Sequence, residues 1–398
     1  MRSATLFLTL VTSASLCLVT SVPAAEWIVA ADGSGQFTKI QQAVDAAQSG
    51  DLIWVMPGTY GKTSVGQKAI SIIGAGADNT VVTSVHVDAA PIGYCVVSGM
   101  TITVYTRITT SAATIVLRDC SGGALDLAGC DQVFIENWHG GAGTSAGVAS
   151  LRITSSTFKG GDGVDAVPSG VPGSWSQVQT RGSAGFSASE SAVYATLSDF
   201  TGGCGGQGSC SSANGLLLGA AGGNGLEDET GDCSFSIAKC TLTPGAGGEG
   251  GPQCAPTSGA TGLLSKAGTK VLWDEQGDDL FPLSIETPSK LGSKTTIGIW
   301  GHPDDTVLLL IGAYPATVSY DGIAGFPFGL DLNAGFINFW PLTRTIEDDG
   351  DLTWTHIIPF DPLLLGTPVF VQALLQAPAG SPYHPPALTG VSVSLIAE

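Results

Sequence analysis

The sequence predicts an all-β protein, in which a right-handed parallel β-helix with an N-terminal capping helix is followed by a C-terminal β-sandwich. Three observations predict this fold class. The chain has 56 glycines and only 12% charged residues among its 398 residues, and the glycine share is about twice the average of roughly 7%, which is typical of short strands and many turns. Apolar landmarks recur at regular steps up to residue 242, and longer segments of alternating polarity follow residue 277.

The repeat is the main signal for the β-helix. Its landmarks lie 18, 18, 20, 42 and 42 residues apart, and they are Ile102, Cys120, Trp138, Phe158, Phe200 and Leu242. We interpret each long step as two units of about 21 residues. Apolar residues stand five positions before the landmarks, namely Val97, Ile115, Val133, Ile153, Ala195 and Ile237. Because strand side chains alternate between two faces, we expect this column to form one continuous internal row.

The residue before each landmark is polar, and glycine pairs follow most landmarks. The polar column consists of Thr101, Asp119, Asn137, Thr157, Asp199 and Thr241. We expect it outside the coils or at their corners. The second glycines of the pairs are Gly123, Gly141, Gly161 and Gly203, and we predict tight turns there because glycine tolerates positive φ.

The first coil needs a cap, because an open sheet edge invites pairing with another chain. Phe37, Ile40, Val44 and Ala47 fall on one helical face, which predicts a short covering helix. Residues 51–56 then read as the first buried strand, closed by a Pro-Gly turn.

Three segments follow from these patterns. Residues 1–25 read as a signal peptide, with Arg2, the apolar run Leu6–Val19 and small residues before the cleavage point. Residues 26–277 are assigned to the β-helix and 278–398 to the β-sandwich. We therefore expect a secreted or cell-surface protein without a membrane span, since the apolar run is shorter than the roughly 20 residues a spanning helix needs.

The cysteine count favours disulfides. Eight cysteines remain after the signal peptide, and an even number in an exported chain indicates pairing. Cys120–Cys130 and Cys204–Cys210 are plausible local pairs, although spacing does not determine the connectivity.

The start of the mature chain resembles a known family. Residues 29–46 read VAADGSGQFTKIQQAVDA, and Pro57-Gly58-Thr59-Tyr60 follows. This opening resembles pectin methylesterases and related right-handed β-helix proteins, and the resemblance implies the β-helix fold. The family's catalytic motifs, Gln-Asp-Thr and Asp-Phe-Ile-Phe-Gly, do not occur in the chain. Residues 360–362 and 368–373 resemble C-terminal sandwich modules of exported bacterial proteins.

The polar column supplies the candidate site. Asp119 and Asn137 should lie on adjacent coils, with Arg118 and Glu136 beside them, and carbohydrate-active β-helices often use a groove along stacked strands. The alternative is that these stacked residues satisfy one another at a coil corner. Farther on, Asp162 and Asp165 are candidate calcium ligands, because calcium prefers carboxylate oxygens.

Charge and motifs limit the function classes. A formal net charge of -19 opposes binding to nucleic acids and anionic membranes. We predict a non-catalytic extracellular or cell-surface binding or structural protein, whose partners are polysaccharide or cell-surface components. No cofactor is required, and Ca²⁺ is the one candidate ion. The alternative is a carbohydrate-active enzyme of the pectinesterase, polysaccharide lyase or glycoside hydrolase kind.

Overall fold

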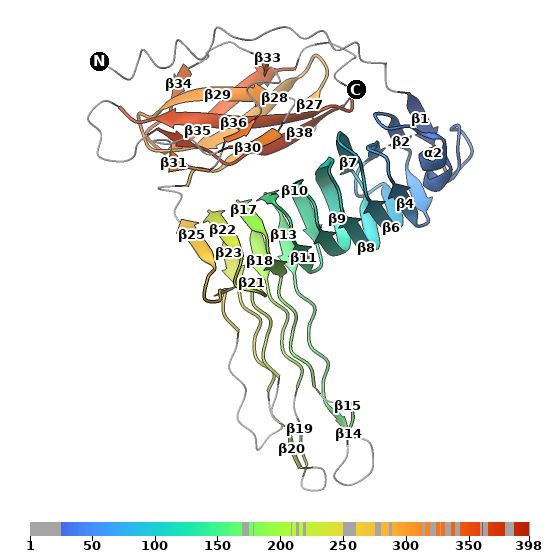
Figure 1. Cartoon of the computed structure of the whole chain (residues 1–398), viewed down its shortest axis with the longest axis vertical. Coiled ribbons are helices and arrows are strands. Elements are labelled where there is room, and N and C mark those ends of the chain that lie inside the picture. The colour runs from blue at the N-terminus through green and yellow to red at the C-terminus, as the bar shows by residue number, and fades with distance from the viewer. Residues whose placement is uncertain are drawn as a thin grey trace.

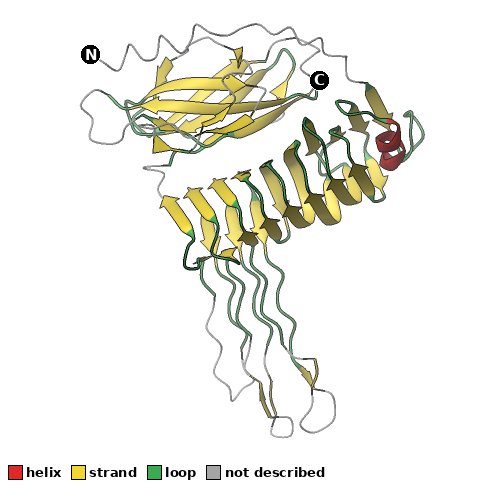
Figure 2. Cartoon of the chain, in the orientation of Figure 1, coloured by secondary structure: helices red, strands yellow, loops and turns green. Residues whose placement is uncertain are grey.

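The computed structural model describes residues 25–168, 175–177, 179–207, 209–211, 215–217, 220–249, 260–274, 280–285, 289–312, 315–318, 324–326, 328–330, 336–338, 343–358, 360, 365–378 and 386–397. The predicted signal peptide therefore lies, apart from Ala25, outside the described residues. Figure 1 shows a β-helix, a second β domain beside it and a long arm that leaves the later coils of the β-helix. Figure 2 shows that strands and loops make up nearly all of the described chain.

The β-helix is a parallel sheet of 21 strands wound into coils, which confirms the predicted fold class. Each complete coil contributes to three flat walls. The first wall, which we call the docked sheet, contains β1 (Glu26–Val29), β2 (Leu52–Val55), β5 (Ser71–Gly74), β7 (Tyr94–Ser98), the starts of β9 (Thr114–Ala128) and β10 (Gln132–Gly140), β12 (Ser150–Thr154), β17 (Ala192–Thr196), β22 (Ser234–Ala238) and β25 (Lys270–Asp274).

Two further walls complete the coils. The corner sheet contains β3 (Gly58–Tyr60), the starts of β6 (Thr80–Asp88) and β8 (Thr101–Thr109), the middle of β9, the end of β10, β13 (Thr157–Lys159), β18 (Asp199–Thr201) and β23 (Thr241–Thr243). The open sheet contains β4 (Thr63–Gly66), the ends of β6, β8 and β9, β11 (Gly143–Ala146), β16 (Phe186–Ser189), β21 (Leu226–Asp228) and β24 (Leu263–Leu264).

A short helix covers the first coil, as predicted. It is α2 (Ile40–Ala46), and it buries Ile40, Ala43 and Val44 against the core. Lys39 is its N-cap residue, and no side chain caps the helix. No helix among the described residues is long and apolar enough to cross a membrane.

The internal apolar column is two rows rather than one. Val97 and Ile153 lie in the same row as Ala195 and Ile237, together with Leu117 and Ile135. Ile115 and Val133 lie in the neighbouring row with Cys95, Leu151, Val193 and Phe235. The prediction of one continuous row is therefore wrong by two residues on these two coils. All of these side chains still face inward and are buried, because a shift of two positions along a strand preserves the face.

Each 42-residue step is one coil with a long excursion, not two coils. Ile153 pairs directly with Ala195, and Ala195 pairs directly with Ile237. The additional residues leave the β-helix after β13, β18 and β23 and return before β16, β21 and β24. Together they form the arm in Figure 1, which carries small hairpins made by β14 (Val167–Pro168) with β15 (Trp175–Gln177) and β19 (Ser209–Ser211) with β20 (Gly215–Leu217).

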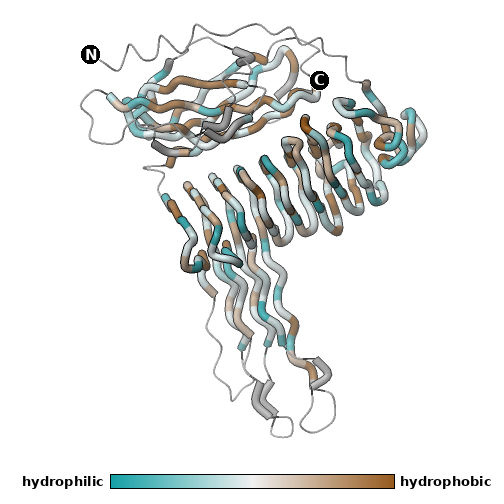
Figure 3. Tube along the Cα trace, viewed as in Figure 1, coloured by the Kyte–Doolittle hydropathy of each residue, from teal (hydrophilic) through white to brown (hydrophobic). Residues whose placement is uncertain are grey.

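The arm consists of extended chains with a three-residue period. The N–H groups of Gly160, Gly163 and Ala166 donate to carbonyl oxygens that are likewise three residues apart, those of Thr201, Cys204 and Gln207. Three residues per turn is the period of the polyproline II helix. None of Gly123, Gly141, Gly161 and Gly203 has a positive φ, so the prediction of tight turns that use positive φ at these glycines is wrong. Figure 3 shows little strongly hydrophobic colouring along the arm, compared with the walls of the β-helix.

Close approach explains the glycines of the arm. A Cβ at Gly203 would lie 2.0 Å from the carbonyl oxygen of Gly161, and a Cβ at Gly206 would lie 1.9 Å from that of Val164. Neither distance is compatible with a side chain. As in other close-packed bundles of polyproline II chains, only glycine fits at such contacts.

The second domain consists of two mainly antiparallel sheets packed face to face, and the larger one includes the parallel pairs β27–β38 and β31–β37. The smaller sheet contains β26 (Leu283–Ile285), β28 (Lys294–Trp300) and β35 (Asp351–Ile357). The larger contains β27 (Ser289–Lys290), β29 (Thr306–Gly312), β31 (Ala324–Gly325), β33 (Phe336–Asn338), β34 (Thr343–Thr345), β36 (Pro368–Gln376), β37 (Ala387–Leu388) and β38 (Ser392–Ala397). A separate pair is formed by β30 (Pro315–Val318) and β32 (Phe328–Leu330). Ile297 and Trp354 of one sheet meet Val307 and Val371 of the other in a shared core.

The described cysteines are free thiols, so the structure does not join Cys120 to Cys130 or place Cys204 in a disulfide. Cys120 pairs with Trp138 in the corner sheet, whereas Cys130 follows the part of β9 that belongs to the open sheet. The two thiols therefore belong to different walls of the core. Cys210 lies in β19, where side chains are not described, and Cys254 lies outside the described residues.

We expect Gly203→Ala to destabilise the arm, because its methyl group would overlap the Gly161 carbonyl. Overpacking of this kind costs about 1–3 kcal/mol. Gly161→Ala is the matched control, since its Cβ would meet only the Ser183 hydroxyl oxygen, at 3.7 Å, and should change the free energy of unfolding by less than about 0.5 kcal/mol. Calorimetric and circular-dichroism melting would compare them, and equal losses in both variants would contradict the close-approach explanation.

Thiol labelling should separate exposed from buried cysteines. Burial raises the pKa of the Cys95, Cys120 and Cys240 thiols to about 12, and the thiolate is the reactive form. Cys204 is exposed. We expect Cys204→Ser to remove one fast-reacting thiol from the folded protein, whereas Cys120→Ser should remove one only after denaturation. A disulfide at either position would instead appear as a gain of one free thiol in the variant, because the substitution would release the partner cysteine.

Candidate functional site

The β-sandwich closes the docked sheet. Val369 and Val371 of β36 point into the sandwich core, while Phe370 and Leu374 point towards the β-helix. Phe370 packs on Phe134 of β10, with ring centroids 4.7 Å apart. The outward apolar side chains of the docked sheet are buried by this contact, and they are Leu52, Ile73, Val96, Val116 and Phe134. A ligand therefore has no access to this wall where the sandwich covers it.

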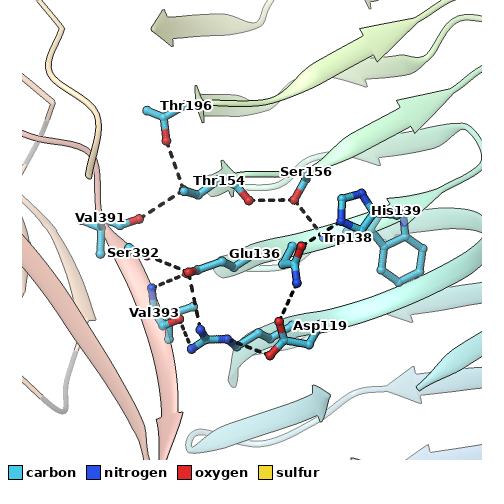
Figure 4. A network of polar contacts seen from close by, with 12 residues as sticks. Asp119, Glu136, Trp138, His139, Thr154, Ser156, Thr196, Val391, Ser392 and Val393 are labelled. Carbon is cyan, nitrogen blue, oxygen red and sulfur yellow. Dashed lines mark hydrogen bonds and ion pairs between the residues drawn. The ribbon is translucent and has the colours of Figure 1, made fainter. Parts of the chain in front are cut away.

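Arg118 and Glu136, two of the predicted ligand-binding residues, lie under the sandwich. They are 1% and 3% exposed. The Glu136 carboxylate accepts hydrogen bonds from the Ser392 hydroxyl at 2.8 Å and the Val393 N–H at 2.6 Å. Arg118 donates to the Val393 carbonyl oxygen and lies 3.7 Å from Glu136. Figure 4 shows the Glu136 side chain directed at Ser392 and Val393 of β38. The structure therefore places these two side chains in the contact between the domains, whereas the sequence predicted them at a ligand-binding surface.

Charge compensation is necessary at this contact. Burial raises the pKa of Glu136, and the nearby Arg118 charge and the two hydrogen bonds oppose the rise. Arg152 lies on the next coil, with its guanidinium 5.1 Å from the centroid of the Tyr194 ring and 5.8 Å from that of Phe134. Burial lowers the pKa of Arg152 to about 10. The docked sheet thus buries both signs of charge beneath the sandwich.

Asp119 and Asn137 lie on adjacent coils, as predicted, at the corner between the docked and corner sheets. Their φ angles are 50° and 54°, a left-handed conformation that Asp and Asn adopt more readily than most residues. The Asn137 amide donates to the Asp119 carboxylate at 2.8 Å, while the two ring nitrogens of His139 bond Asn137 at 2.8 Å and Thr157 at 2.9 Å. Figure 4 shows the part of this chain of contacts that runs from Asp119 to His139. This geometry matches the alternative interpretation, in which the polar side chains at the coil corner form hydrogen bonds with one another.

Asp162 and Asp165 bond the arm's own backbone. The two carboxylates accept the N–H groups of Cys204 and Gln207, both at 2.7 Å. The same relation recurs one coil later, where the Gln207 side chain accepts the N–H of Glu249 at 2.8 Å. Among the described residues, no group of three or more His, Cys, Asp or Glu side chains could hold a metal ion. Their observed contacts give Asp162 and Asp165 a role in linking neighbouring chains.

The open sheet carries a row of outward side chains on five successive coils, which we call the open-sheet row. The residues are Ser64, His86, Arg107, Asp126 and Thr144, and each pairs with the next in the strand register. Tyr105 precedes Arg107 on the same face of β8, two positions away. All lie on rigid parallel strands rather than on loops.

Short contacts connect the members of the open-sheet row. Arg107 bonds Asp126 at 2.7 Å, and Thr144 donates to the other oxygen of Asp126 at 3.0 Å. The rings of His86 and Tyr105 are 5.2 Å apart, and the Arg107 guanidinium lies 5.8 Å from the Tyr105 ring centroid. The Arg107 and Asp126 side chains are 53% and 40% exposed. The row therefore offers an aromatic ring, an imidazole and hydrogen-bonding groups of both signs to a ligand.

His86 is held in its neutral form at neutral pH. Partial burial lowers its pKa first, and the positive charges of Lys62 and Arg107 lower it further. A neutral imidazole has one donor and one acceptor nitrogen. The Nε2 atom of His86 is buried without a hydrogen-bond partner, so a ligand hydroxyl group does not reach that nitrogen in this conformation.

The sequence prediction of the candidate site did not include His86, Tyr105, Arg107 or Asp126. A signal was present, because His86, Arg107, Asp126 and Thr144 are 21, 19 and 18 residues apart, close to one coil each. The landmark column lies in the corner sheet and the apolar column five residues earlier lies in the docked sheet, so neither column passes through the open sheet.

Comparisons with known proteins give little guidance. No protein family matches the chain, and no curated protein matches it. Two solved structures are similar in part. One is the enzymatically active domain of bacteriophage CBA120 tailspike protein 2, with 9% identity, a TM-score of 0.24 and coverage of 85% of this chain and 70% of that chain. The other is the full-length tailspike protein 2 from an Escherichia coli O157:H7 bacteriophage, with 10% identity, a TM-score of 0.24 and coverage of 85% and 63%.

We expect Arg118→Met to destabilise the docked sandwich by about 3–5 kcal/mol, because it leaves a buried carboxylate without its partner charge. The double variant Arg118→Met, Glu136→Gln should lose less, since no charge stays buried. Urea unfolding would measure both, and a double variant as unstable as the single one would contradict this account.

The pH dependence gives a control for the same variants. The raised pKa of Glu136 means that the folded protein favours the protonated carboxyl group. The resulting contribution to the free energy of unfolding is present at low pH and is lost as pH rises through the folded pKa. The Arg118→Met variant should therefore regain stability between about pH 7 and pH 5, and the double variant should not.

Proposed function

We propose that this protein is a non-catalytic extracellular binding protein, which holds a carbohydrate chain against the open-sheet row. The single observation that carries the proposal is the row itself, in which polar and aromatic side chains repeat once per coil on a wall that the sandwich leaves uncovered. The extracellular location rests on the export signal read from residues 1–25.

The chemistry of the row suits a sugar. Carbohydrates present many hydroxyl groups, which bond donors and acceptors alike, and apolar faces of C–H groups, which pack on aromatic rings. Arg107 and Asp126 supply charged hydrogen-bonding groups, and the neutral His86 ring lies beside Tyr105. Tyr105 supplies a half-buried ring with a polar end. A net charge of -19 favours neutral chains over polyanionic ones.

The sandwich leaves no ligand site on the part of the docked sheet that it covers. Arg118 and Glu136 are committed to β38, so the charges predicted for a ligand serve the interface between domains. The arm adds a second rigid element beside the open sheet. We interpret the whole as a scaffold that displays surfaces at fixed positions.

Binding to a panel of immobilised neutral and acidic polysaccharides tests the proposal. We expect Tyr105→Ala and Arg107→Ala each to weaken binding at least about tenfold, since a lost hydrogen bond to a charged group costs about 1.5–3 kcal/mol. Lys159→Ala is the control, because it removes an exposed cation from the corner sheet and should bind like the wild type.

Two outcomes would overturn the proposal. One is binding that both open-sheet variants retain at wild-type strength. The other is release of sugar or methanol from any polysaccharide that is abolished by Asp126→Asn, which would show that the protein is the carbohydrate-active enzyme that forms the alternative.

A further inference from the structure

The arm repeats its own construction every 42 residues. Its three outgoing chains are residues 160–166, 202–207 and 244–249, which we call the first, second and third outgoing chains. Gly160 of the first chain donates to Thr201, and Gly202, 42 residues later, donates to Thr243. Gly163 and Gly205 repeat the pattern towards Cys204 and Ala246. Equivalent positions can therefore be compared directly among the three chains.

Contact with a preceding chain requires glycine at two positions. In the second chain, Gly203 and Gly206 face the carbonyl oxygens of Gly161 and Val164, as described above. In the third chain, Gly245 and Gly248 would place a Cβ 1.9 and 2.0 Å from the carbonyl oxygens of Gly203 and Gly206. Another chain can therefore pack in the same way on the side that these positions face only if both positions are glycine, because a Cβ there would overlap a carbonyl oxygen of the added chain.

The first chain departs from this rule. In the first chain, the residue equivalent to Gly206 and Gly248 is Val164, which is 45% exposed. A Cβ at the other position, Gly161, would meet only the Ser183 hydroxyl oxygen within 4 Å. The valine therefore places a branched side chain where an added chain would have to approach within contact of the backbone.

The third chain departs from the pattern on the opposite side. Position 244, the equivalent of Gly160 and Gly202, is proline. Those two glycines donate their N–H groups to the next chain, whereas proline has no N–H. Its fixed φ of about -65° still suits a polyproline II chain. The third chain therefore lacks the backbone N–H that would form the first hydrogen bond to a fourth chain, while its polyproline II conformation is kept.

We infer that Val164 and Pro244 close the two outer sides of the arm, so that it takes up no chain from a second copy of the protein. Open edges with unpaired backbone groups are sites of edge-to-edge association, and proline and bulky side chains are common means of blocking them. The arm then works as a free-standing spacer, and the molecule does not assemble through it. This inference is independent of the proposed ligand.

Sedimentation velocity of the full chain tests the inference. Over about a hundredfold range of concentration, the wild type and Val164→Ala, which keeps a Cβ, should show the same sedimentation coefficient. The double variant Val164→Gly, Pro244→Gly should show a weight-average mass that rises at least about twofold with concentration, because both sides are opened.

Circular dichroism on the same samples verifies that the arm stays folded. If the double variant loses the arm, the single variant Val164→Gly carries the test, since its site is a half-exposed edge. A folded glycine variant that sediments like the wild type at every concentration would overturn the inference. A wild type that self-associates, with the association lost when residues 161–182 are replaced by a two-residue turn, would overturn it as well.

Discussion

Backbone hydrogen bonding between chains one coil apart is the interaction on which the whole structure depends. In the β-helix it takes the form of parallel strands, as between Ile153 and Ala195. In the arm the contact between chains one coil apart continues, and the Gly160 N–H donates to the Thr201 carbonyl oxygen. The chain changes from strand to polyproline II conformation without leaving its neighbour. Side chains decide which form is adopted: alternating apolar residues build a wall with a dry interior, and closely spaced glycines allow backbones to meet directly.

The sandwich depends on the β-helix in a different way. Its larger sheet is apolar on both faces, because β36 contributes alternate residues to its own core and to the docked sheet. Phe370 on Phe134 supplies the apolar part of that contact, and Arg118 with Glu136 supplies a buried polar part that bonds the backbone of β38. A buried ion pair adds little net stability compared with apolar residues, but it is costly to break. It therefore favours a single docked position of the sandwich.

The domain contact also determines which surface is left for binding. Once the docked sheet is covered and the corner is occupied by the mutual bonds of Asp119, Asn137 and His139, the open sheet is the wall with exposed, varied polar chemistry. The arm begins and ends beside this wall, since its chains return to β16 and β21. A rigid wall and a stiff arm, both held by backbone contacts, can present side chains at fixed spacing without large loops.

The sequence alone determined the length of the coils before residue 158, the inward alternation, the helical cap and the change to a second β domain, because each of these is visible in the local pattern. It predicted correctly that Asp119 and Asn137 would be neighbours on adjacent coils. It could not show that Arg118 and Glu136 would be buried, since their partners Ser392 and Val393 lie more than 250 residues away. Nor could it show that each 42-residue step is one coil. A glycine-rich segment can form either a strand of a coil or a polyproline II chain of the arm, and the difference lies in which chain it contacts. Tertiary structure decided both points, since burial and backbone pairing depend on the chain that lies opposite, which local pattern does not specify.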